Sequence, residues 1–293
     1  MNNGQKMYAA LLSKKLVLAV NEAQLVRQQF KQLNQDNYYC PSCKKRVILI
    51  VSQYKIPFFK HISFIKGAGE TQEHLLSKKL LYSALVAYGY RARMEVSLAE
   101  NQLRADILVS KNLAFEIQCA PLSEEEFKHR HSLYADLQIK DIWIVGRRHY
   151  LGKKLFKSQQ KYLRKSKIWG WYLLEVDSKT MTLHLKYFIE LAPNNNKCRY
   201  KIENFKLDEQ GLNKLFKFDP GKNKVINSNY QNELMYLKKQ LNKKTKFGGQ
   251  IGEDLYFLGL TLENIPKEIL IKWREPFEKK RIVEFLEQKK AIS

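Results

Sequence analysis

One segment of the chain, residues 71–146, constrains the fold more than any other feature of the sequence. TQEHLLSKKLLYSALVAYG spaces its apolar side chains as one face of a helix, with Thr71 as N-cap and Gly89 as the stop. PLSEEEFKHRHSLYADL predicts a second helix, with Ser123 capping it. Between these helices lie three runs typical of strands, at 91–98, 103–109 and 113–119.

DIWIVG follows the second helix and is short and fully apolar, as expected of a parallel strand buried at the centre of a sheet. SKN, between the second and third strands, predicts a tight hairpin. The order of helix, three strands, helix and strand therefore predicts an α/β fold, with a mixed sheet flanked by helices.

The composition indicates a globular protein. The chain has 293 residues, of which 44% are hydrophobic and 12% aromatic, which is enough to bury a sizeable core. Its four cysteines form no disulfide framework. The N-terminus has no secretory pattern, and no apolar run reaches the roughly 20 residues needed to span a bilayer. We expect a cytoplasmic protein without a membrane partner.

The charge points to a polyanionic partner. Lys and Arg total 52 against 29 Asp and Glu, for a net charge of +23. Residues 71–149 are nearly balanced, whereas the segments on either side are strongly basic. A metal-dependent nuclease needs carboxylates at its reaction centre and cations along the path of the nucleic-acid backbone. A solvated basic surface is the alternative.

Two carboxylates interrupt the apolar strands. Glu116 and Gln118 are two residues apart, so they share one face of the third strand. A hairpin at 110–112 would bring Asp106, on the second strand, beside them. Converging carboxylates suit Mg²⁺ or Mn²⁺ and phosphodiester hydrolysis. The alternative is single charges on half-exposed strands, but both strands look buried on both faces, where an unpartnered carboxylate is costly.

The remaining sequence predicts three parts. Residues 1–66 form a β-rich cysteine-knuckle module, 67–150 the nuclease-like core, and 151–293 a basic, mostly helical region that also contains a strand pair at WGWYLLEV and TLHLKYF. The glycines of GAGE, at 67–70, mark the first boundary.

The pair Cys40 and Cys43 has the spacing of a zinc knuckle. One such pair supplies only half of a tetrahedral site. A redox CxxC is the alternative, although the sheet and helix context that it needs is absent here.

The stretch YLGKKLFKSQQKYLRKSK interleaves basic and aromatic residues. Its cations suit phosphates, and Phe156 and Tyr162 suit stacking on exposed bases. An amphipathic helix packed on the core is the alternative, and both can hold. The predicted nucleic-acid contacts are Lys153, Lys154, Lys157, Lys161, Arg164 and Lys165.

The strings RADIL, AFEIQ, LSEEEFKHRHSLY and DIWIVG, in this order, resemble the CoiA family of competence proteins, and CPSCKKRVILIV and FFKH extend the resemblance toward the N-terminus. That family is similar to the PD-(D/E)xK nucleases, with Gln in place of the final Lys. The resemblance implies a restriction-endonuclease-like core and a role in natural transformation and DNA recombination. The implied partners are single-stranded or branched DNA and a RecA-type recombinase.

The resemblance also implies roles for individual residues. Asp106 and Glu116 would bind Mg²⁺ or Mn²⁺, and Gln118 would orient water. Glu73 would be an additional acid in the site.

Several further positions match the family less tightly. Lys78 or Arg130 would supply the positive charge that Gln118 lacks, and Tyr134 matches the family's following Tyr; helix-surface packing is an equally good reading of Arg130 and Tyr134. His74 would hydrogen-bond to a ligand rather than bind metal.

In the cysteine module, His61 matches the family's third Zn²⁺ ligand, but Phe58 stands where the family has a further His. The fourth ligand is left open between water, His74 and another group.

Three functions follow from the sequence. The first is a metal-dependent DNA nuclease or junction-processing enzyme of transformation. The second is a non-cleaving DNA-binding accessory factor that assists recombinase loading. The third and weakest is an RNA-processing protein.

Overall fold

The structure is a computed structural model that describes residues 6–62 and 71–292. The chain divides into two compact units. The first comprises Met1–Tyr150, Leu174–Leu185 and Glu203–Phe218, and the second comprises Leu151–Leu173, Lys186–Ile202 and Asp219–Ser293. The expected boundary at GAGE lies outside the described residues.

The N-terminal part of the first unit is a small antiparallel sheet, as expected of a β-rich module. Its strand order is β2-β1-β3-β4-β5. Tyr38, Ile48 and Phe59 are buried within it. The elements are β1 (Ala9–Leu12), β2 (Lys15–Leu18), α1 (Ala19–Arg27), β3 (Tyr38–Tyr39), β4 (Arg46–Ile50) and β5 (Phe58–His61).

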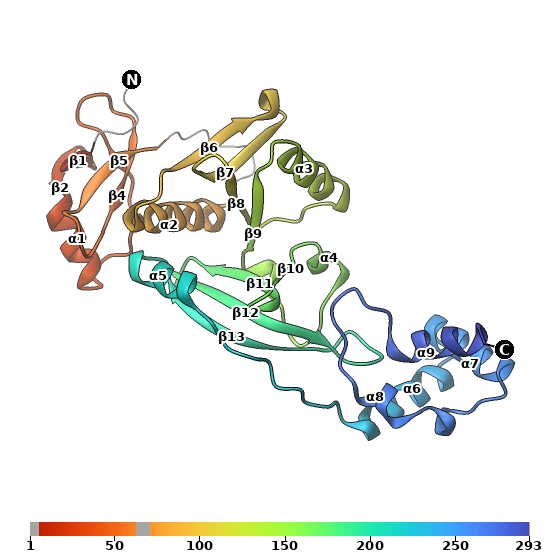
Figure 1. The fold of residues 1–293 in the computed structure, drawn as a ribbon. Helices are drawn as coiled ribbons and strands as arrows, with labels where there is room; N and C mark the ends of the chain where they lie inside the picture. Colours follow the sequence, from red (N-terminus) through yellow and green to blue (C-terminus); the bar gives the residue numbers. More distant parts are fainter. Residues whose placement is uncertain (1–5, 63–70, 293) are drawn as a thin grey trace. The chain divides into compact units, whose positions relative to one another are not determined.

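A larger mixed sheet carries the candidate site, with strand order β13-β12-β11-β9-β8-β7-β6, and β10 pairs with β11 (Figure 1). β6, β7 and β8 are antiparallel, whereas β9 runs parallel to both β8 and β11. The prediction that DIWIVG forms a central parallel strand is therefore confirmed. The strands are β6 (Ala92–Leu98), β7 (Leu103–Val109), β8 (Leu113–Gln118), β9 (Lys140–Val145), β10 (Arg164–Ser166), β11 (Gly170–Asp177), β12 (Thr182–Leu191) and β13 (Cys198–Lys206).

Besides α1, the described part of the first unit contains the helices α2, α3 and α5. α2 (Gln72–Tyr88) lies against β6, β7 and β8, α3 (Glu124–Asp136) against β9, and α5 (Glu209–Lys217) against α2 (Figure 1). Both predicted N-caps are present, because Thr71 Oγ1 accepts the N–H of His74 at 3.2 Å and Ser123 Oγ accepts that of Glu126 at 3.0 Å. Gly89 ends α2 with a φ of 118°, which favours glycine.

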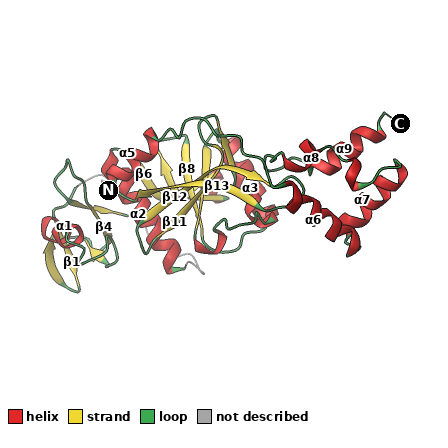
Figure 2. Cartoon of the chain, turned by 90° about the horizontal axis from the view of Figure 1, so that it is seen from below, coloured by secondary structure: helices red, strands yellow, loops and turns green. Residues whose placement is uncertain are grey.

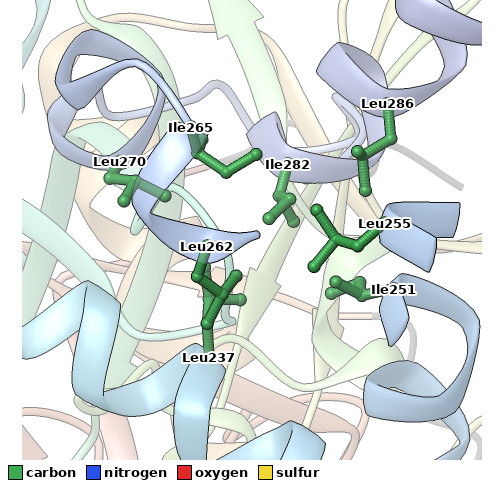
Figure 3. Close-up of a cluster of buried hydrophobic side chains, with 8 residues drawn as sticks. All are labelled: Leu237, Ile251, Leu255, Leu262, Ile265, Leu270, Ile282 and Leu286. Carbon is green, nitrogen blue, oxygen red and sulfur yellow. The ribbon is translucent and has the colours of Figure 1, made fainter. Parts of the chain in front are cut away.

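The C-terminal part of the second unit is helical (Figure 2). Side chains from α6, α7 and α9 point toward one another around a common apolar core, for example Leu237, Ile251 and Ile282 (Figure 3). The helices of this unit are α4 (Lys157–Gln160), α6 (Tyr230–Asn242), α7 (Lys246–Phe257), α8 (Lys267–Ile271) and α9 (Arg281–Lys290). Short 3-10 turns lie at Ala99–Asn101 and Arg147–His149 in the first unit and at Leu262–Asn264 in the second.

The segment after residue 150 is less helical than the sequence indicated. Cys198–Lys206 forms β13 because the turn through 192–197 returns the chain beside β12, where its backbone groups are paired. The basic stretch forms only the single turn of α4 and the short strand β10. Among the described helices, none combines the length and apolarity needed to cross a membrane.

Candidate functional site

Three carboxylates lie in a row across adjacent strands. Glu95 on β6 and Asp106 on β7 occupy facing positions in the antiparallel register. Ile107 on β7 pairs with Phe115 on β8 in an antiparallel register. Asp106, one residue before Ile107, therefore lies opposite Glu116, one residue after Phe115, and Glu116 continues the row. Glu116 is 1% exposed and Asp106 8% exposed. Burying three neighbouring acids requires compensating partners.

Asp106 is held as a carboxylate. Its Oδ2 accepts the backbone N–H of Ile117 at 2.8 Å and lies 3.1 Å from His74 Nε2. Its Oδ1 lies 3.5 Å from Lys78 Nζ. Burial alone would raise the pKa of Asp106, but the hydrogen bond with His74, the charges of His74 and Lys78 and the Ile117 N–H together lower it.

The pKa of Glu116 is shifted in the opposite direction, upward. Burial, and then the neighbouring charge of Asp106, raises the pKa of Glu116 to about 8, against the opposing effects of Arg130 and Tyr134. Tyr134 donates its hydroxyl hydrogen to Glu116 Oε1, and Arg130 Nη2 donates to Oε2. The two neighbouring carboxyl groups therefore differ in direction: the pKa of Asp106 is lowered and that of Glu116 is raised.

Lys78 is the cation nearest the centre of the row. Its side chain is 1% exposed and forms an ion pair with Glu95. Arg104 Nε lies 2.8 Å from the other oxygen of Glu95. Both cations that the sequence suggested in place of a catalytic lysine, Lys78 and Arg130, thus contact a carboxylate of the row.

A cavity of 180 Å³ opens beside Asp106, and His74, Gln118, Cys119 and Arg130 contribute to its wall. Gln118 Nε2 donates to the carbonyl oxygen of Ala120 at 2.7 Å, which fixes the amide at the wall. The structure therefore brings Asp106, Gln118 and Arg130 to one space. Among the described residues that form this wall, Glu116 is absent.

Glu73 faces elsewhere. Its Oε1 accepts the backbone N–H of Arg147 at 2.9 Å, and its side chain lines a separate cavity of 330 Å³ together with Asp177. A Cβ on Gly146 would lie 2.9 Å from Glu73 Oε1 and 2.6 Å from Cys119 Sγ, so only glycine leaves room for both. The structure does not bring Glu73 into the cavity lined by Asp106.

Cys40, Cys43 and His61 converge in the N-terminal module. Their ligand atoms all lie within 4.8 Å of one another, and Cys43 Sγ is 3.2 Å from His61 Nε2. Burial would raise the pKa of Cys40, but hydrogen bonds from Cys43 and Ser42 outweigh it and lower the pKa. Two thiols and an imidazole suit Zn²⁺ as three of its four ligands. Within residues 6–62 and 71–292, this is the one such ligand cluster.

The predicted basic contacts divide into two groups in the second unit. Lys153, Lys154 and Lys157 are exposed. Arg164 instead donates to the carbonyl oxygen of Lys161 at 2.8 Å, and both side chains are partly buried. Lys165, which is exposed, pairs with Glu275 at 2.6 Å, and Tyr162 is 1% exposed, so this ring cannot stack on a base.

Sequence reasoning missed three charged residues. Glu95 was overlooked because a single acid on an alternating strand is ordinary, although MEV does interrupt apolar neighbours. Lys197 and Lys280 were overlooked because they are far along the chain from the basic stretch that they join. In the sequence alone, Lys197 is only the end of an asparagine-rich turn.

Two sequence models of protein families match the chain. A sequence model described as competence protein CoiA, nuclease-like domain, matches residues 70–220. A second, described as competence protein CoiA, N-terminal domain, matches residues 23–64. No curated protein and no solved structure matches the chain. The family matches support a competence-related role for a protein with a nuclease-like domain.

Proposed function

Because this chain belongs to the CoiA family of competence proteins, we propose that its nuclease-like domain binds Mg²⁺ or Mn²⁺ through Asp106 and Glu116 and cleaves DNA during natural transformation. One observation carries the proposal. Asp106 and Glu116 are adjacent and buried, and the charge of Asp106 helps to hold the pKa of Glu116 at about 8. A divalent cation would offset the repulsion of two ionised carboxylates at this position.

Each residue around the cavity would have a separate role in binding the metal, the water or the phosphate. A bound divalent ion polarises a phosphate and makes water more nucleophilic. Asp106 reaches the cavity as a carboxylate, and Glu116 would join it after losing its proton. Gln118 uses its amide nitrogen on Ala120, and its amide oxygen can accept a hydrogen bond from water. Arg130, on the cavity wall, would donate to phosphate oxygens.

Lys78 would act through Asp106. Its Nζ lies 3.5 Å from Asp106 Oδ1, and this cation is one of the groups that lower the pKa of Asp106. We therefore propose Lys78 as a positioning residue that keeps Asp106 ionised, in the place of the lysine that Gln118 replaces. The order of α2, β6 to β9 and α3 supports a restriction-endonuclease-like core.

The N-terminal module would hold Zn²⁺ through Cys40, Cys43 and His61, with water or another group as the fourth ligand. In this role the ion would stabilise the folded module, because the binding energy of a structural zinc ion contributes to folding.

The contacts of Glu116 and Glu73 favour a second function, DNA binding without cleavage. Both oxygens of Glu116 have hydrogen-bond partners, Arg130 and Tyr134, and Glu73 faces a different cavity. These contacts suit a domain that binds single-stranded or branched DNA without cutting it and assists loading of a RecA-type recombinase.

A cleavage screen separates the two functions. The purified chain would be incubated with single-stranded, duplex and branched DNA, and with matched RNA strands, in Mg²⁺ and in Mn²⁺. Glu116→Gln and Asp106→Asn would accompany the wild type. Asp141→Asn is the matched control, because Asp141 is also a buried strand carboxylate but bonds to His131 and Trp143. Metal-dependent cleavage lost only in the first two variants supports the nuclease. Binding without cleavage of any DNA supports the accessory factor, and cleavage of RNA alone contradicts both.

A further inference from the structure

The second unit contains a cavity of 430 Å³ with four lysines in its wall: Lys154, Lys157, Lys197 and Lys280. The described residues that line this space include no carboxylate. Four like charges around one cavity repel one another, and the repulsion grows where the surroundings exclude water. An anion in the cavity would remove that cost.

The backbone brings these lysines together from three parts of the sequence. Residues Lys154 and Lys197 form a β-bridge, and Leu155 N donates to the carbonyl oxygen of Asn196 at 2.9 Å. The start of α9 is fixed to the same turn, because Ile282 N donates to Asn194 Oδ1 at 3.0 Å. Hydrogen bonds to the turn through 192–197 therefore fix the main-chain positions from which these lysines extend.

Some other lysines of this unit have acidic partners. Lys165 pairs with Glu275 and Lys279 pairs with Glu287, each at 2.6 Å. For the four lysines of the cavity, no carboxylate among the described residues lies within ion-pair distance. Lys280 instead lies over the ring of Phe247, with its Nζ 3.2 Å from the ring centroid. Lys154, Lys157 and Lys197 thus remain available to a ligand in this cavity.

Aromatic rings border the same space. Phe156 lines the cavity and is 61% exposed, while its backbone N–H is fixed by a 2.9 Å hydrogen bond to Gln159 Oε1. Tyr236, from α6, also lines it. An exposed ring beside unpaired cations is the combination by which proteins hold single strands, where phosphates meet lysines and bases stack on aromatic faces.

We propose that this cavity binds the phosphate backbone of single-stranded nucleic acid, with Phe156 stacking on a base. That the ligand is a nucleic acid rests on the proposed DNA-processing function. The presence of an anion site with an exposed aromatic ring is independent of that function. A duplex would fit the lysines, but its stacked bases would not be available to Phe156. The site belongs to the second unit and uses none of the residues of the carboxylate row.

Binding of the full-length chain to fluorescent oligo(dT) of about 16 nucleotides tests the proposal. A hairpin duplex with the same number of phosphates would be measured in parallel, without added divalent metal so that nothing is cleaved. The variants are Lys154→Ala/Lys197→Ala, Lys280→Ala and Phe156→Ala. The matched control is Lys222→Ala/Lys224→Ala, which removes the same charge from exposed lysines of the same unit.

We expect the Lys154→Ala/Lys197→Ala variant to bind oligo(dT) at least tenfold more weakly. The slope of log affinity against log salt should fall by about 0.7 for each phosphate that the variant no longer neutralises. Phe156→Ala should weaken oligo(dT) binding roughly tenfold and leave duplex binding unchanged. The control should change both affinities by less than about twofold.

The proposal is overturned if the cavity variants behave like the control, or if Phe156→Ala weakens single-strand and duplex binding equally. These results are distinct from a failure of the proposed cleavage. If the wild-type chain cuts no DNA but the cavity variants bind oligo(dT) more weakly, the nucleic-acid site is supported and the nuclease activity is contradicted. If the wild-type chain cuts DNA and the cavity variants bind oligo(dT) normally, the nuclease activity is supported and the nucleic-acid site is contradicted.

Discussion

The carboxylate of Asp106 accepts the backbone N–H of Ile117 at 2.8 Å, one residue beyond Glu116 on the adjoining strand. This bond fixes the Asp106 side chain against β8 through the main chain. The closeness of Asp106 and Glu116 is therefore a property of the sheet register, and substitutions that keep an oxygen at position 106 should preserve it.

Stability should depend on pH through Glu116. The pKa of Glu116 is raised to about 8 from its ordinary value, so the folded state binds a proton that the unfolded state has lost above about pH 5. The contribution is fully present at low pH and is lost as pH rises from about 5 to 8. Asp106 has a lowered pKa, so its contribution is lost only in strong acid, below about pH 4.

Urea unfolding at pH 5, 6, 7 and 8 measures this effect. We expect the free energy of unfolding to fall by on the order of 3 kcal/mol over that range because Glu116 ionises. Glu116→Gln should flatten the curve, whereas Asp141→Asn should retain its slope. Equal slopes in wild type and Glu116→Gln would show that Glu116 titrates normally.

Removing Lys78 should deprive two buried acids, Glu95 and Asp106, of one of their cationic partners. Lys78→Met is expected to destabilise the protein by about 3–5 kcal/mol, because breaking a buried ion pair costs more than the pair contributes. Adding Glu95→Gln should restore much of the loss. Lys128→Met is the control, because Lys128 is 73% exposed and lies 3.8 Å from Glu124 on a helix surface. Denaturant midpoints that shift equally in Lys78→Met and Lys128→Met would contradict this role.

Zinc should accompany the N-terminal module. The wild-type chain is expected to retain about one zinc per chain after dialysis, measured by elemental analysis. Cys43→Ser and His61→Ala should lose it and lower the melting temperature. Cys198→Ser, at a thiol far from this cluster in the sequence, should retain it. Full zinc content in Cys43→Ser would place the ion elsewhere.

Local signals in the sequence predicted the elements of the nuclease-like domain. Thr71 begins α2 through its side chain and Gly89 ends it through its left-handed backbone. Both effects act within one helical turn, so they can be read from the sequence. The apolar run DIWIVG became the central parallel strand because only a fully buried strand tolerates it. The hairpin after β7 placed Asp106 beside Glu116 because its register depends on a short turn.

Long-range features could not be predicted in the same way. The position of Glu95 opposite Asp106 depends on the register of β6 with β7, across a connection in which Ala99, Glu100 and Asn101 all have positive φ. The resemblance to the CoiA family implied that Glu73 is an additional acid of the site, but its Oε1 accepts the backbone N–H of Arg147. The partner of each of these carboxylates depends on which group is nearest in the folded chain, and no spacing in the sequence specifies that group.

The central claim is that Asp106 and Glu116 form one metal site, and calorimetry of Mn²⁺ binding at pH 7 in two buffers of different ionisation enthalpy tests it most directly. Because the pKa of Glu116 is about 8, binding should release close to one proton, and affinity should increase as pH rises toward 8. We expect Glu116→Gln to abolish the proton release and to weaken Mn²⁺ binding at least tenfold, while Asp141→Asn changes neither. Unchanged Mn²⁺ affinity and proton release in Glu116→Gln would contradict it.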